Sequence, residues 1–191
     1  MQLAQHVDAQ GETDAMAGNA LSASGKRFRA ATYYLLAERT MSWSDPRRLY
    51  AYCKGLNAFT AAVNGSDDRI ERLDIPYEDG SLAAWLCLPP GKGSFPCVLM
   101  VNGLDDLKEM HLLIFRRMAV VRGLAILFVD QEGTGEAVRL QTHAKRAESE
   151  MSAGLFLDAL TARPDIDASR FAVRDARAER GRVRRATRGG V

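Results

Sequence analysis

The feature that most constrains the fold is a change in the hydrophobic period along the chain. Residues 69–75 alternate apolar and charged side chains, and after a turn at 76–80 an apolar stretch runs from Leu82 to Leu88. This pattern predicts a β-hairpin that is partly exposed to solvent. Beyond a loop rich in Gly and Pro, Cys97–Val101 and Leu124–Val129 are apolar throughout. Continuous apolar runs of this length are typical of strands that are covered on both faces.

Helical patterns separate these apolar strands. One helix is predicted over about 107–121 and a longer one over 144–162, and Arg170–Val173 then begins a third buried strand. Because strand–helix–strand connections are right-handed, the three strands are expected to form a parallel sheet. The fold class predicted from the sequence is therefore α/β, with a hairpin at the start of the sheet.

The region before the hairpin has a different character. Residues 1–25 are rich in Ala, Ser, Gly and Gln, and we expect them to be weakly ordered. Residues 26–66 follow a helical period and predict two amphipathic helices. The second begins at Ser44-Asp45-Pro46, a cap followed by proline, and ends at Asn64-Gly65. The predicted organisation is thus a helical segment at 26–66 and an α/β domain at 67–173.

Three spaced motifs resemble one branch of the α/β-hydrolase superfamily. Residues 101–109 read V-N-G-L-D-D-L-K-E, residues 122–125 read R-G-L-A, and residues 130–136 read D-Q-E-G-T-G-E. They are similar to stretches in dihydroxypseudooxynicotine hydrolase, the fermentation-respiration-switch-like esterases and fungal polyketide-shortening hydrolases. The resemblance implies the N-terminal half of an α/β-hydrolase sheet preceded by a helical segment. One departure is Glu132, where the family usually has proline.

The resemblance also implies roles for the loop after the first parallel strand. Such hydrolases use a serine nucleophile, a histidine base, a carboxylate and an oxyanion hole to cleave an ester or carbon–carbon bond of a small-molecule substrate. Gly103 and Leu104 match the loop that supplies one oxyanion donor, and Asp105 matches an acidic active-site residue. Alternatively, Asp105 is the N-cap of the following helix. Lys108 and Glu109 are expected to hold the loop in place.

The residues for nucleophilic catalysis are missing where this fold requires them. A Gly-x-Ser-x-Gly elbow should follow Val173, but no serine occurs after Ser169. The histidine of the fold comes last in chain order, whereas His111 and His143 precede the nucleophile strand, so we interpret both as surface or loop residues. We therefore expect this chain to be an inactive, truncated form of the hydrolase. Its last strand would have an exposed edge, through which copies of the chain could associate.

The tail at 174–191 is expected to be disordered. It holds seven arginines against two acidic residues, so its net charge is +5 and that of the remaining chain is −3, given +2 for the whole. This composition is typical of a GC-rich gene read out of frame. Starting one base into the codon of Arg174, the codons of residues 177–182 permit Gly-x-Ser-x-Gly-Gly. A reading-frame shift near this point is the resulting hypothesis.

Two other classes of function are suggested by parts of the sequence. A dinucleotide-binding protein is suggested by Gly133-Thr134-Gly135, but Val138 stands where a third small residue belongs. An interaction protein could contact nucleic acid through the Arg-rich tail, but the tail has no aromatic residue to stack on bases. We expect no metal, no cofactor and no membrane segment. Three cysteines without a CxxC motif favour the reducing cytoplasm.

Overall fold

The computed structural model describes residues 1–103, 105–144, 150–175 and 184–185. The chain divides into two compact units, Met1–Asp68 and Arg69–Val191, close to the boundary at 66–67 that the sequence predicted. None of the helices in this described part has the length and apolarity needed to cross a bilayer.

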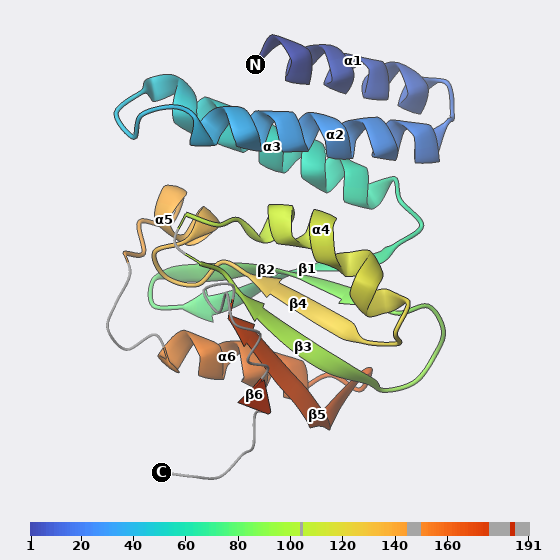
Figure 1. The fold of residues 1–191 in the computed structure, drawn as a ribbon, viewed down its shortest axis with the longest axis vertical. Helices are drawn as coiled ribbons and strands as arrows, with labels where there is room; N and C mark the ends of the chain where they lie inside the picture. Colours follow the sequence, from blue (N-terminus) through green and yellow to red (C-terminus); the bar gives the residue numbers. More distant parts are fainter. Residues whose placement is uncertain (104, 145–149, 176–183, 186–191) are drawn as a thin grey trace. The chain divides into compact units, whose positions relative to one another are not determined.

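The first unit consists of three helices, α1 (Gln2–Met16), α2 (Ala20–Arg39) and α3 (Pro46–Asn64), shown in Figure 1. Helix α2 packs against both α1 and α3. Helix α3 begins as predicted, because the Asp45 side chain accepts a hydrogen bond from the backbone N–H of Arg47 at 2.9 Å. Aromatic packing of Phe28 on Phe59, with ring centroids 5.4 Å apart, joins α2 to α3.

The prediction that residues 1–25 are weakly ordered is wrong. These residues form α1 and the first turns of α2. Small side chains are the physical reason: Ala4 and Ala23 are buried, and a Cβ atom at Gly11 would lie 3.0 Å from Cγ of Arg27 on α2. A scarcity of large apolar residues is often typical of disordered segments, but here it allows these helices to approach closely.

The second unit contains a six-stranded sheet in the order β1-β2-β4-β3-β5-β6. Strand β1 pairs with β2, and β2 with β4, in antiparallel fashion, whereas β3 is parallel to both β4 and β5. The structure thus confirms the hairpin and the three parallel strands that the hydrophobic period predicted. The strands are β1 (Arg69–Tyr77), β2 (Gly80–Leu88), β3 (Phe95–Val101), β4 (Ala125–Val129), β5 (Ile166–Asp175) and β6 (Arg184–Arg185).

Helices cover both faces of this sheet (Figure 1). They are α4 (Lys108–Val120), the short α5 (Gly135–Arg139) and α6 (Glu150–Thr161). Leu86 of β2 belongs to one core cluster with Phe156 of α6, whereas its neighbour Trp85 bonds to Glu109 of α4. Successive strand residues point to opposite faces, so α4 and α6 lie on opposite sides of the sheet.

The outer edge of β5 differs from the prediction. Ala172 and Val173 pair with β6, so the edge is not bare at these two positions. Arg174, the first residue of the predicted disordered tail, is part of β5, and its guanidinium lies 4.4 Å from the ring centroid of Phe115 on α4. The rest of that prediction concerns 176–183 and 186–191, which lie outside the described residues.

Candidate active-site loop

The candidate site is the loop at 102–107, which leaves the carboxyl end of β3 beside the carboxyl end of β4. The amide side chain of Gln131, which follows β4, forms hydrogen bonds with both the backbone N–H and the backbone carbonyl of Asn102. Gln131 Oε1 accepts from Asn102 N at 3.1 Å, and Gln131 Nε2 donates to Asn102 O at 2.6 Å. The side chain thereby acts as one more rung of the β3–β4 ladder and fixes where the loop begins.

Gly103, predicted to belong to the oxyanion loop, lies at this sheet edge. Its backbone N–H donates to Asp106 Oδ2 at 3.2 Å, and His111 Nε2 lies 3.5 Å from the same oxygen. An N–H that is engaged in this way is available to an oxyanion only after Asp106 releases it. Leu104, the other predicted oxyanion residue, lies outside the described residues.

Asp105 has a different local role from the helix cap considered above. Helix α4 begins at Lys108 with Leu107 as its N-cap residue, so the alternative that Asp105 caps this helix is wrong. Asp105 instead has a φ of 61°, in the left-handed region, and its Oδ1 accepts from Arg139 Nη2 at 3.0 Å. Its side chain is 42% exposed. Arg139 therefore holds a partly exposed carboxylate at the tip of the loop.

The N-terminus of α4 is capped by the buried side chain of Asp130, which follows the neighbouring strand β4. Its Oδ1 accepts from the backbone N–H of Lys108 at 3.0 Å, and its Oδ2 accepts from that of Glu136 at 2.8 Å. One carboxylate thus binds the N-terminal turns of both α4 and α5, where the helix dipole favours negative charge. Gly135 makes this possible, because a Cβ there would lie only 2.0 Å from Cγ of Asp130.

Lys108 completes the buried network beneath the loop. Its ammonium group lies 2.7 Å from Asp130 Oδ2, 2.8 Å from Glu136 Oε2 and 2.8 Å from Glu109 Oε1, and its side chain is fully buried. Trp85 Nε1 donates to Glu109 at 3.1 Å. The expectation that Lys108 and Glu109 hold the loop in place agrees with these contacts. They tie the start of α4 to β2, β4 and α5.

The two glutamates of this network have opposite pKa shifts. Burial by itself raises the pKa of Glu136, but the positive charge of Lys108 and the bidentate contact with Arg72 outweigh burial and hold that pKa at about 2. Burial raises the pKa of Glu109 above its ordinary value, although Lys108 opposes the shift. Of these two glutamates, Glu109 is therefore the one that takes up a proton first as the pH falls.

The carboxylates of Glu109, Asp130 and Glu136 lie close enough together to hold a metal ion, with oxygen atoms within 4.8 Å of one another. The ammonium group of Lys108 contacts all three of them, however. Because a cation already occupies the centre of the cluster, we interpret it as structural and not as a metal centre.

The burial of three polar residues was not predicted from the sequence. His111 and His143 are buried, which corrects their interpretation as surface residues, although His143 does lie in a loop. Glu132 is 3% exposed, and its carboxylate oxygens have no hydrogen-bond partner among the residues that the structure describes. Its departure from the family's proline was the available signal that this turn is unusual.

The described residues contain no Gly-x-Ser-x-Gly elbow. Burial raises the pKa of the Cys97 thiol to about 12, so this cysteine stays protonated at neutral pH. Strand β5, which leads to the nucleophile in a hydrolase of this kind, ends at Asp175. The predicted position of the elbow falls on 176–183, outside the described residues.

The order of the strands, the loop after β3 and its anchoring by the residue after β4 define the N-terminal half of an α/β-hydrolase domain. The sequence profile described as "Esterase FrsA-like" matches residues 6–184. The chain therefore belongs to the FrsA-like esterase family.

Individual relatives agree with this assignment. "Alpha/beta hydrolase gkaG" of Penicillium citrinum is 30% identical over 173 residues, covering 85% of this chain and 40% of the relative. "Esterase FrsA" of Enterobacter sp. (strain 638) is 30% identical over 107 residues, which is 56% of this chain and 26% of the relative. The crystal structure of 2,6-dihydroxy-pseudo-oxynicotine hydrolase superposes with a TM-score of 0.82 at 23% identity, covering 92% of this chain and 48% of that one. This chain thus spans less than half the length of these relatives.

The two alternative functions gain no support. The turn Gly133-Thr134-Gly135, which suggested a dinucleotide site, wraps around Asp130 instead. The carboxylate of Asp130 already accepts from the N-terminal turn of α5, where a pyrophosphate would have to bind. The family assignment likewise gives no support to a nucleic-acid-binding protein.

Proposed function

We propose that this chain supplies the oxyanion-loop half of a serine hydrolase that cleaves an ester or carbon–carbon bond in a small molecule. The observation that carries the proposal is the loop at 102–107, held at the carboxyl ends of β3 and β4 by the buried Lys108–Asp130 network. In this proposal Gly103 and Leu104 contribute to the oxyanion hole, and Asp105 faces the substrate.

We further propose that the chain by itself is inactive, because its sequence contains no serine after β5 and no later histidine. Residues 174–191 are attributed to a shifted reading frame, and the next frame is expected to encode the Gly-x-Ser-x-Gly elbow. Sequencing the DNA of this region tests the attribution directly, since a next frame without such a codon string would refute it.

The oxyanion role of Gly103 is tested in the protein expressed from the frame-restored gene. Gly103→Pro removes the backbone N–H, whereas Gly103→Ala keeps it. Loss of one oxyanion donor typically lowers kcat by about 10²–10³-fold. We expect a loss of this size for the proline variant and a much smaller one for the alanine variant, measured with a chromogenic ester. Equal losses in both variants would refute a role for this N–H.

A cytoplasmic location is also proposed, supported by the three cysteines, all of which are free thiols. Self-association is also proposed through the outer edge of β5, since β6 pairs with two residues of that strand among the residues that the structure describes. Size-exclusion chromatography across a range of concentrations tests it, and a monomer at every concentration would refute it.

A further inference from the structure

A buried carboxylate without a described partner lies in the turn that follows β4. The residue is Glu132, which is 3% exposed. Neither its Oε1 nor its Oε2 has a hydrogen-bond partner among the residues that the structure describes. A carboxyl group that is buried without a partner is costly in either charge state. Contacts among the described residues therefore do not explain why a carboxylate stands at this position.

The backbone at this position favours proline and does not require glutamate. Thr134 N donates to Gln131 O at 3.0 Å, which closes a β-turn over residues 131–134. Gly133, the third residue of the turn, has a φ of 78°, whereas Glu132 is not among the residues with a positive φ. These values define a type II turn, in which proline is favoured at the second position. Among the described residues, no hydrogen bond uses the backbone N–H of Glu132.

The basic side chains that surround the candidate loop are bound to other carboxylates. Lys108 and Arg72 both contact Glu136, at 2.8 Å and 2.7 Å. Arg139 donates to Asp105 at 3.0 Å. These cations therefore do not neutralise Glu132.

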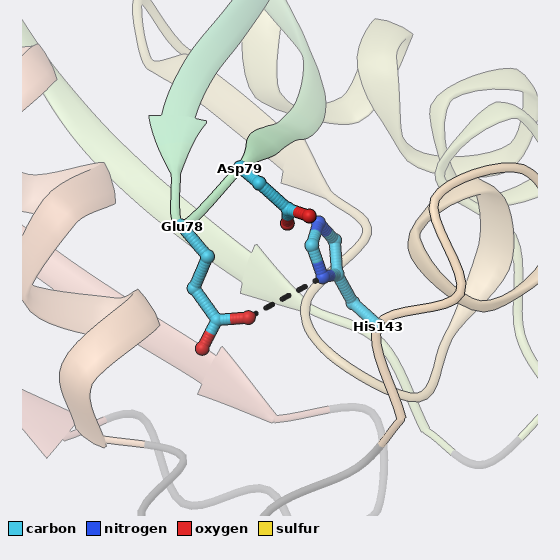
Figure 2. Close-up of side chains that lie close together, drawn as sticks. All are labelled: Glu78, Asp79 and His143. Carbon is cyan, nitrogen blue, oxygen red and sulfur yellow. Dashed lines mark ion pairs between the residues drawn. The ribbon is translucent and has the colours of Figure 1, made fainter.

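The ring of His143 is not a partner of Glu132 either. Gly133 N donates to the backbone carbonyl of His143 at 2.9 Å, which brings this loop next to the turn. The ring itself faces the β1–β2 hairpin, where Nδ1 lies 3.7 Å from Glu78 Oε2 (Figure 2). A Cβ atom at Gly80 of the same hairpin would lie 3.1 Å from Nε2. Both ring nitrogens are thus directed to the hairpin.

The turn that carries Glu132 lies beside the candidate oxyanion loop. Gln131, the preceding residue, binds both backbone polar groups of Asn102, which precedes Gly103. In open α/β sheets, ligands bind outside the carboxyl ends of the parallel strands, and β3 and β4 both end here. Asn102 Oδ1 is a second buried acceptor without a partner among the described residues. A ligand that donates hydrogen bonds matches these acceptors.

We propose that Glu132 is a specificity-determining residue that binds a protonated primary amine of the substrate. A primary ammonium group carries a positive charge and three N–H donors, which match a buried carboxylate that has no cation among the described residues. A divalent metal ion such as Ca²⁺ or Mg²⁺ takes about six or more oxygen ligands, more than Glu132 and Asn102 offer. The inference rests on the proposed function, since the amine is taken as part of the hydrolase substrate. Binding of an ammonium group does not itself need the catalytic residues.

Thermal unfolding of the full chain with a small organic cation tests the inference. The probe is n-butylammonium chloride at about 20 mM and pH 7, compared with equal concentrations of NaCl and of n-butanol, which lacks the charge. A dissociation constant of about 2 mM gives a rise in Tm of about 3 °C at this concentration. We expect this rise in the wild-type chain and none beyond the NaCl control in Glu132→Gln. Glu12→Gln removes an exposed carboxylate on α1 and should retain the full rise.

Glu132→Pro gives a second variant that the type II turn accommodates. We expect its Tm without ligand to be at least that of the wild-type chain, with no response to the ammonium probe. A lower Tm of both Glu132 variants would mean that the carboxylate already has a partner within the chain, and would overturn the proposal. No rise in the wild-type chain beyond the NaCl control, or an equal rise in Glu132→Gln, would also overturn it. Turnover is not measured, so none of these results bears on the proposed hydrolase activity, which has its own test.

Discussion

Replacing Lys108 by methionine removes the one cation that contacts three buried carboxylates. Asp130 keeps other donors, and Glu136 keeps Arg72, but Glu109 is left with Trp85. Breaking a buried ion pair by removing one partner costs about 3–5 kcal/mol. Protonation of Glu109 limits the loss, so we expect a decrease of this size in the free energy of unfolding and not the sum of three contacts.

Urea denaturation followed by circular dichroism at pH 7 measures this loss. Lys92→Met makes the same change at an exposed loop position and serves as the matched control, for which we expect a change below about 0.5 kcal/mol. Because Glu109 takes up a proton in the variant, the loss should be smaller at pH 5 than at pH 8. A Lys108→Met variant as stable as Lys92→Met would refute the argument that this network holds the loop.

Two further predictions concern the same network. Gly135→Ala places a Cβ against Asp130 at a φ of 43° and should cost about 3 kcal/mol or more in urea denaturation, whereas Gly154→Ala, on an open face of α6, should stabilise the chain by about 0.5–1 kcal/mol. A tolerated Gly135→Ala would contradict the tight fit around Asp130. The low pKa of Glu136, about 2 against an ordinary 4.5, gives about 3 kcal/mol that is present above pH 4.5 and is lost as pH falls toward 2. The free energy of unfolding should therefore fall less steeply between pH 4.5 and pH 2 in Glu136→Gln than in the wild-type chain. An unchanged pH profile in this variant would contradict the low pKa of Glu136.

The sheet could be predicted from the sequence because its strands carry a strong periodic signal. The start of α3 was predicted for a similar reason, since Asp45 and Pro46 act through local backbone geometry. Helix α1 was missed because it packs through Ala4 and Gly11, whose small size gives little hydrophobic signal. Close packing of small residues depends on the partner helix and is not encoded in one segment alone.

The position of the candidate loop was predicted from the sequence, but the contacts that hold it were not. The motifs placed Gly103 and Asp105 in the loop after the first parallel strand, and both residues follow β3 in the structure. The capping of α4 by Asp130 could not be predicted, because the two lie 22 residues apart along the chain. A local cap by Asp105 was the simpler hypothesis, and the left-handed φ of this residue was not visible in the sequence.

We propose that this chain carries the loop half of a FrsA-like hydrolase and that residues 1–191 do not include its nucleophile elbow. The deciding experiment compares ester hydrolysis by the purified chain with that by the product of the gene read in the next frame after Val173. We predict no turnover above the buffer rate for the chain as it stands, and turnover for the frame-restored protein. Ester hydrolysis by the chain itself would contradict the account.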